Sequence, residues 1–134
     1  MIVLDASATV EMLLGTPLGE RVLERVVQPG ESLHAPHLLD VEVVSVFRRL
    51  LAAGQVGEGR ASQAITDLSD LDLVRYSHGD LVGRAWTLRA TVSAYDAMYV
   101  ALGEALDATV LTCDRRLARS HGHRATIEVV ELAG

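Results

Sequence analysis

The first residues of the chain join a short apolar run to a carboxylate, and this feature restricts the fold more than any other. Residues 2–4 are Ile-Val-Leu, and Asp5 follows directly. Such a run is typical of a strand buried on both faces of a parallel α/β sheet. A second run, 108–112, has the same character and is followed closely by Asp114. Because α/β sheets bind ligands at the carboxyl ends of their strands, Asp5 and Asp114 are expected to be neighbours there.

The rest of the chain alternates helical and strand patterns. Further strands are expected at 32–35, 73–76 and 127–131, and helices at 7–14, 17–28, 37–53, 57–71, 79–90, 93–106 and 115–120. Ser7 is expected to cap the first helix and Pro36 to open the third. The helix at 37–53 is apolar around most of its circumference, which predicts that it is mostly buried.

This alternation predicts an α/β fold in three layers, a parallel five-stranded sheet flanked by helices with right-handed crossovers. The length of 134 residues is typical of one domain, so a single domain spanning 1–134 is expected.

Composition excludes several function classes. Aromatic residues make up 4% of the chain and the net charge is -6, which disfavours base stacking and a general nucleic-acid coat. The single Cys113 cannot close an internal disulfide, and the N-terminus lacks the features of a signal peptide. No uncharged apolar stretch is long enough to span a bilayer. A cytoplasmic protein without a membrane partner is expected.

Two further carboxylates lie in unusually apolar surroundings. Glu42 is flanked one helical turn away by Leu38, Leu39 and Val46, and Asp96 sits in a similar helical segment. A buried charge must be paired, metal-bound or protonated. For Glu42 the alternative to a metal is a buried Arg partner, and for Asp96 it is a favourable charge in the first turn of a helix.

Asp5 and Asp114, taken alone, can each be a helix cap. Together the four acids form a set of ligands that are all oxygen atoms. No nearby His or Cys is expected to join this set. Neighbouring carboxylates repel unless a proton or a cation lies between them. Oxygen-only sets suit Mg²⁺ or Mn²⁺ and do not suit structural zinc.

Four stretches, 2–7, 35–43, 94–102 and 111–117, resemble the PIN-domain ribonucleases, specifically the VapC-type toxins of toxin–antitoxin pairs. The resemblance spans nearly the whole chain. It implies a sheet whose first and fourth strands are central neighbours, and a metal-dependent endoribonuclease activity. The acidic quartet of the family falls on Asp5, Glu42, Asp96 and Asp114, and its polar position before the last acid falls on Thr112. Asp40 is an additional acid, but it does not share a helical face with Glu42.

The resemblance also implies partners: an RNA substrate, a cognate antitoxin whose tail covers the crevice, and a second copy in a homodimer. In an Mg²⁺ or Mn²⁺ site the ions activate a water molecule and polarise the scissile phosphate. Thr112 and Ser7 are candidates to orient carboxylates or to contact a phosphate, with strand-end or capping hydroxyls as the alternative. Arg115, Arg116 and Arg119 are candidates for RNA phosphate contacts, or form a solvated helix face.

Three other functions remain open at this point. A haloacid dehalogenase-type phosphohydrolase would also use Asp5, but its site needs a second acid two positions later, where the chain has Ser7. A phosphate-receiving regulatory domain usually needs a Lys, and all 12 basic residues are Arg. A catalytically silent PIN-like binding module would keep the acidic crevice and lack the activity.

Overall fold

Five strands form one parallel sheet in the computed structural model, which describes residues 1–132. The strands are β1 (Ile2–Leu4), β2 (Leu33–Pro36), β3 (Leu73–Tyr76), β4 (Thr109–Thr112) and β5 (Ile127–Val129). Their order is β3-β2-β1-β4-β5, and every neighbouring pair is parallel. The predicted α/β fold is therefore confirmed, with the first and fourth strands as central neighbours. The expected domain boundary at 134 includes residues 133–134, which lie outside the described part.

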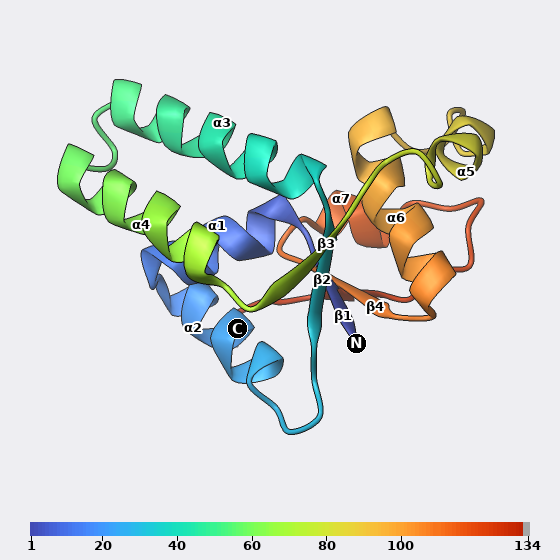
Figure 1. Cartoon of the computed structure of the whole chain (residues 1–134), viewed down its shortest axis with the longest axis horizontal. Coiled ribbons are helices and arrows are strands. Elements are labelled where there is room, and N and C mark those ends of the chain that lie inside the picture. The colour runs from blue at the N-terminus through green and yellow to red at the C-terminus, as the bar shows by residue number, and fades with distance from the viewer. Residues whose placement is uncertain (133–134) are drawn as a thin grey trace.

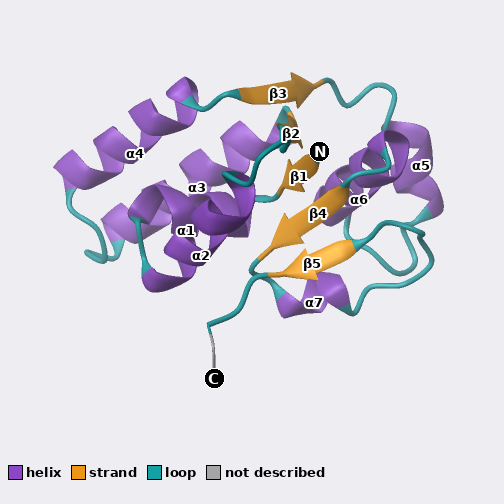
Figure 2. Cartoon of the chain, turned by 90° about the horizontal axis from the view of Figure 1, so that it is seen from below, coloured by secondary structure: helices purple, strands orange, loops and turns teal. Residues whose placement is uncertain are grey.

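Helices fill the connections between the strands (Figure 1). They are α1 (Ala6–Leu14), α2 (Pro17–Val26), α3 (Leu38–Ala52), α4 (Glu58–Asp70), α5 (Val82–Thr87), α6 (Ala94–Leu106) and α7 (Arg115–Ala118). In Figure 2, α1 to α4 lie on one side of the strands and α5 and α6 on the other, while α7 lies beside β5. Among the described helices, none is both long and apolar enough to cross a membrane.

Both faces of the central strands are buried. Val3 of β1 and Val110 of β4 belong to a large apolar cluster that includes Val100 of α6. Leu4 belongs to a second cluster, which contains Val22 of α2. Because successive strand residues point to opposite faces, an apolar residue at every position is what a sheet covered on both sides requires.

The pairing of β1 with β4 determines the edge of the sheet at which the candidate residues lie. Leu4 is aligned with Leu111, and the backbone N–H of Asp5 donates to the carbonyl of Leu111 at 3.2 Å. Asp5 and Thr112 therefore leave the sheet side by side.

Three local expectations were wrong. The cap of α1 is Asp5 and not Ser7, because the Asp5 carboxylate accepts a hydrogen bond from the backbone N–H of Ala8 at 2.9 Å. Pro36 is the last residue of β2 instead of the first of a helix. The helix expected at 79–90 is shorter, since α5 covers only Val82–Thr87.

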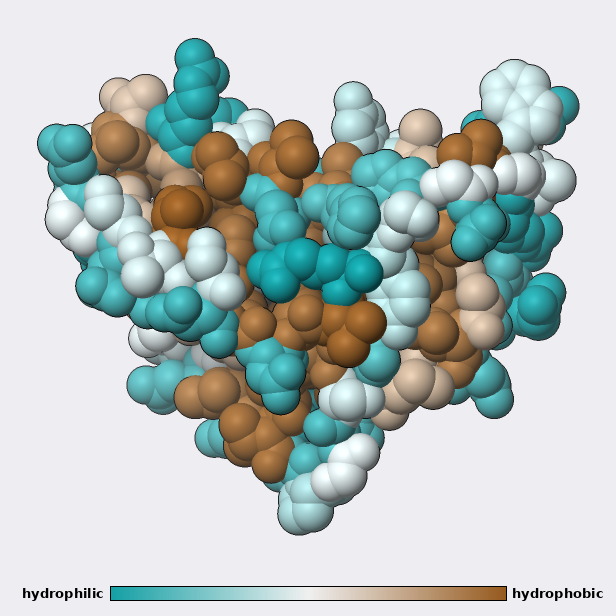
Figure 3. Space-filling model, in the orientation of Figure 1, coloured by the Kyte–Doolittle hydropathy of each residue, from teal (hydrophilic) through white to brown (hydrophobic). Residues whose placement is uncertain are grey.

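The expectation that α3 is mostly buried was also wrong. Its buried residues are Leu39, Val43 and Phe47, whereas Val41 is 67% exposed and Val44 49% exposed. The helix extends away from the sheet as an antiparallel pair with α4 (Figure 1), so only one of its faces is covered. Apolar side chains consequently appear on the molecular surface over this region (Figure 3).

Candidate active site

Asp5 is the most enclosed of the four predicted acids. It is 7% exposed, and its Oδ1 accepts hydrogen bonds from the Ser7 hydroxyl at 2.8 Å and the Ala8 backbone N–H at 2.9 Å. Its Oδ2 accepts from the Thr112 hydroxyl. Burial raises the pKa of Asp5 to about 6, although these three donors oppose the shift, and the charge of Asp96 adds to it. The carboxylate is therefore held in place at an electrostatic cost.

Glu42 lies in α3 and reaches across to α6. Its Oε1 accepts a hydrogen bond from the Tyr99 hydroxyl at 2.6 Å. Burial raises the pKa of Glu42, the Tyr99 hydrogen bond lowers it, and the charge of Asp96 raises it again, with a net upward shift. Within residues 1–132 Glu42 forms no ion pair. The buried Arg partner considered as an alternative is absent from this part of the chain.

Asp96 lies in the first turn of α6, three residues after Ser93, which caps this helix. The backbone N–H of Asp96 donates to the Ser93 hydroxyl at 3.1 Å. Burial and the charge of Asp114 raise the pKa of Asp96, against smaller opposing effects of Ser93 and Arg116. A carboxylate that only complemented a helix N-terminus would be stabilised as an anion, whereas the pKa of Asp96 is raised, first by burial and then by the charge of Asp114.

Asp114 caps α7 and is the least repelled of the four. It accepts a hydrogen bond from the backbone N–H of Arg116 at 2.9 Å, and the Arg116 guanidinium lies 3.2 Å from its Oδ2. Burial alone would raise the pKa of Asp114, but Arg116 and Arg119 together lower it. Asp114 is thus both a helix cap and part of the acidic cluster.

The four acids form one electrostatically coupled group around Asp96. Its charge raises the pKa of Asp5 and of Glu42, and Asp114 in turn raises that of Asp96. In the described residues, however, no three Asp, Glu, His or Cys side chains approach closely enough to hold an ion together. The oxygen-only donors fit Mg²⁺ or Mn²⁺, which commonly bind through few carboxylates and keep water in their shells.

Two hydroxyls connect Asp5 with Asp114. Ser7 and Thr112 lie 3.1 Å apart between their hydroxyl oxygens. Thr112 donates to Asp5 and accepts from the backbone N–H of Asp114 at 2.9 Å, while Ser7 accepts from the N–H of Cys113 at 2.9 Å. Both hydroxyls therefore support the carboxylates and the loop after β4.

The arginines after Asp114 differ in their surroundings. Arg115 pairs with Glu131 at 2.8 Å on the exposed surface, so its guanidinium is engaged by an acid outside the group of four. Arg116 and Arg119 line an open groove of about 460 Å³ together with Asp96 and His121. The two arginines therefore place positive charge beside Asp96, at one edge of the acidic cluster.

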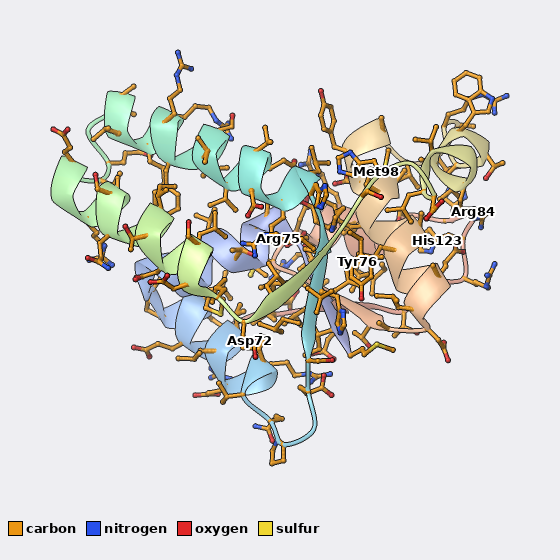
Figure 4. The ribbon with its side chains drawn as sticks, in the orientation of Figure 1. Asp72, Arg75, Tyr76, Arg84, Met98 and His123 are labelled. Atoms are coloured by element: carbon orange, nitrogen blue, oxygen red, sulfur yellow. The ribbon has the colours of Figure 1, made fainter. Side chains whose placement is uncertain are left out.

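The contacts of Asp40 and Tyr99 bear on which acid of α3 belongs to the site and on which neighbouring residue the sequence did not point to. Asp40 is bound by Arg75 of β3 at 2.8 and 3.1 Å, and Figure 4 labels Arg75 beside the sheet. Asp40 is therefore engaged elsewhere, which supports the choice of Glu42. Tyr99 was missed by the sequence analysis, although it lies one helical turn after Asp96 and so shares its face of α6.

A sequence pattern and a close relative agree on the family. The PIN domain pattern matches residues 2–121. Ribonuclease VapC12 of Mycobacterium tuberculosis is 42% identical over 130 residues, which cover 97% of this chain and 99% of that protein.

Solved structures share the fold at low sequence identity. The chain resembles Mycobacterium tuberculosis VapC20, described as a sarcin-ricin loop cleaving toxin, with a TM-score of 0.68 and 15% identity over 92% of this chain and 97% of that one. It also resembles VapBC2 of Rickettsia felis bound to a promoter DNA fragment, with a TM-score of 0.71 and 13% identity over 98% of this chain and 100% of that one.

Proposed function

The chain belongs to the PIN-domain family and is of the VapC ribonuclease type, and from this premise we propose that it is a metal-dependent endoribonuclease toxin. The observation that carries the proposal is that Asp5, Glu42 and Asp96 are carboxylates whose burial raises the pKa of each, and that each is also repelled by a neighbouring acid of the same group. Such repulsion is relieved by a cation. Phosphodiester hydrolysis then follows as the reaction, with RNA as the substrate.

Asp5, Glu42, Asp96 and Asp114 would hold the cation, either directly or through water, and Mg²⁺ or Mn²⁺ fits the donor set. A bound ion of this type supplies a water molecule of lowered pKa and neutralises charge on the phosphate. Asp114 is proposed to act on a second ion or on its waters.

The protein's own groups would fix the geometry. Ser7 and Thr112 keep the Asp5 carboxylate from rotating, since each donates to one of its oxygens. Arg116 is proposed to contact an RNA phosphate, because its guanidinium is largely exposed and adjoins the groove next to Asp96. Arg119, in the same groove, is proposed to do likewise. Arg115, which pairs with Glu131, is a weaker candidate.

The test uses purified protein freed of any partner, incubated with mixed RNA in the presence and absence of Mg²⁺ or Mn²⁺. We expect cleavage only with metal. Asp5→Asn should abolish it while the circular dichroism spectrum stays unchanged. Metal-independent silence of the folded protein would instead support the binding module. Sequencing the new ends of the fragments would identify the RNA target.

The remaining alternatives have less support. Ser7 occupies the position where a haloacid dehalogenase-type phosphohydrolase needs its second acid, and its hydroxyl donates to Asp5. That arrangement suits a supporting hydroxyl. An RNA substrate also agrees with the cytoplasmic location expected from the sequence.

We also propose a cognate antitoxin and a second copy of the chain as partners. A homodimer is supported by exposed apolar side chains on α5 and α6, where Trp86 is 66% and Tyr95 62% exposed. An apolar groove beside them includes Met98 (Figure 4). Light scattering on the isolated chain would measure the mass expected for two copies, and Trp86→Ala should shift it towards one copy.

A further inference from the structure

The hydroxyl of Tyr99 makes a contact to which the proposed reaction assigns no role. Tyr99 is 2% exposed, and its hydroxyl donates to Glu42 Oε1 at 2.6 Å. The contact joins α6 to α3, whose first turns lie close to each other in Figure 1. A phenol has a single proton to donate, so in this arrangement that proton is committed to Glu42.

The Glu42 carboxylate has fewer other hydrogen-bond donors around it than the carboxylates of Asp5 and Asp114 have. Asp5 is held by three hydrogen-bond donors, and Asp114 is held by its capping contact and by Arg116. Glu42 has a longer side chain with more rotatable bonds, and it is repelled by Asp96. In residues 1–132, the only hydrogen bond that its carboxylate accepts comes from Tyr99. Without it, the half-buried carboxylate is free to turn outward to water.

The direction of the hydrogen bond also matters. A carboxylate has two oxygens that can each accept hydrogen bonds or bind a cation. The contact with Tyr99 uses Oε1, so Oε2 remains available. A buried phenol would be satisfied equally well by a backbone carbonyl. Here it meets Glu42, whose carboxylate, like that of Asp96, is held by no basic group or backbone N–H of the described residues.

We propose that Tyr99 is a positioning residue: its hydroxyl fixes Glu42 Oε1 so that Oε2 remains directed to a divalent cation or to a water bound to it. This inference rests on the proposed function. Groups that orient metal-binding carboxylates typically change metal affinity or activity by about 10- to 100-fold when they are removed.

The test is Mn²⁺ binding by isothermal titration calorimetry. Tyr99→Phe removes one oxygen and keeps the ring, and we expect the Mn²⁺ dissociation constant to rise about 10-fold. The Mn²⁺ concentration that gives half-maximal RNA cleavage should rise by the same factor, with the KM for RNA unchanged. The matched control is Tyr76→Phe, which removes a phenol bound to His34 Nδ1 at 2.7 Å on β3 (Figure 4) and should leave Mn²⁺ affinity within about twofold of the wild type, since this phenol contacts none of the four acids.

A double-mutant cycle separates positioning from a general structural role. In a Glu42→Ala background, Tyr99→Phe should cause no further loss of Mn²⁺ affinity, because the hydroxyl acts only through Glu42. An equal loss with and without Glu42 would overturn the proposal. So would a Tyr99→Phe protein that binds Mn²⁺ as tightly as the wild type. If Tyr99→Phe fails to fold, Glu42→Asp replaces it: the shortened carboxylate no longer reaches the hydroxyl, and the same loss is expected.

The cycle also distinguishes failure of this inference from failure of the proposed function. A wild-type protein that binds Mn²⁺ but leaves RNA intact would refute the nuclease, while the Mn²⁺ cycle would still decide the role of Tyr99. A protein that cleaves RNA normally after Tyr99→Phe, at every Mn²⁺ concentration, would refute the inference and leave the nuclease standing.

Discussion

At the scale of single residues, the four acids are stabilised to different degrees, and this sets how each responds to substitution. Asp5 is fully engaged by donors yet has a raised pKa, because burial outweighs its hydrogen bonds. Asp114 has a lowered pKa because two arginines outweigh its burial. Burial also raises the pKa values of Glu42 and Asp96, and the charge of Asp96 adds to the shift of Glu42. The protein without metal therefore carries an electrostatic penalty that is concentrated on three residues.

Asp5→Asn should stabilise the metal-free protein at neutral pH. The folded-state pKa is about 6 instead of 3.8, so the stability linked to protonated Asp5 is complete below pH 3.8 and is lost as the pH rises through 6. That loss corresponds to about 3 kcal/mol. Asn caps helices as well as Asp does and carries no charge. Urea unfolding in chelator should show the variant to be more stable at pH 7, with the difference closing near pH 4.

If the wild type and Asp5→Asn were equally stable across this pH range, the ionised Asp5 carboxylate would not destabilise the folded protein, and the prediction would be wrong. The comparison is internal to one position, so the titration of groups that are not coupled to Asp5 cancels between the two proteins. Loss of the helical circular dichroism signal in the variant would instead show that Asn cannot replace the carboxylate as the cap of α1.

Glu42→Gln and Asp96→Asn should each leave the melting temperature in metal-free buffer unchanged or raise it, because each removes like-charge repulsion. The amide oxygen introduced by Glu42→Gln can still accept the hydrogen bond from Tyr99. Asp40→Asn is the control: it breaks a partly exposed ion pair with Arg75 and should cost about 0–1 kcal/mol while RNA cleavage persists. Differential scanning calorimetry measures all three variants. A loss of several degrees in Glu42→Gln or Asp96→Asn would indicate a structural role for that carboxylate.

At the scale of elements, local sequence signals predicted where most of the helices and strands lie. Thr16 and Pro17 begin α2, and Ser93 caps α6, as their residue types indicate. The strand at Leu73–Tyr76 has the predicted bounds. The strand-end positions of Asp5 and Asp114 were readable because β1 and β4 are short apolar runs. These features are determined by residues that are close in the sequence, and patterns of nearby residues predict such features reliably.

What local patterns could not supply was the pairing of distant surfaces. An all-round apolar pattern predicted a buried α3, but whether its outer face is covered depends on how far α3 extends past the sheet. The Tyr99–Glu42 contact joins residues 57 positions apart, and no spacing rule connects them. The cap of α1 was misassigned because both Asp5 and Ser7 are good capping residues, and only the backbone geometry of Asp5 decides between them.

Gly19→Ala tests the contact between α1 and α2. A Cβ atom at Gly19 would lie 1.8 Å from the carbonyl oxygen of Glu11 and 2.4 Å from its carbon. Both are backbone atoms, so the two helices would have to move apart, and we expect a destabilisation of about 3 kcal/mol. The control is Gly59→Ala in α4, where nothing lies within 4 Å and a helical Ala should be neutral or stabilising by up to about 1 kcal/mol. Similar urea midpoints for the two variants would show that α1 and α2 do not pack this closely.

At the scale of the whole molecule, one buried carboxylate joins three segments on the side of the sheet opposite α3. Glu104 of α6 has a side chain that is 3% exposed. It accepts hydrogen bonds from Arg84 of α5 at 2.7 and 2.9 Å and from the backbone N–H of Arg124 at 2.9 Å. Figure 4 labels Arg84 beside α6, together with His123 of the segment that leads to β5. This contact links the edge strand β5 to the helix that carries Asp96 and Tyr99.

The same contact predicts how the fold responds to acid. The hydrogen bond from Arg84 is the main reason that the pKa of Glu104 falls to about 2, below its ordinary 4.5. A lowered folded-state pKa contributes stability that is complete above pH 4.5 and is lost as the pH falls through 2. Glu104→Gln should therefore be less stable than the wild type at pH 7, and urea unfolding should show the difference closing between about pH 4.5 and 2. Glu128→Gln, which breaks a more exposed pair with Arg25, should cost only about 0–1 kcal/mol. If both variants lose the same stability at pH 7, then the contact between Glu104 and Arg84 contributes no more than an ordinary surface ion pair.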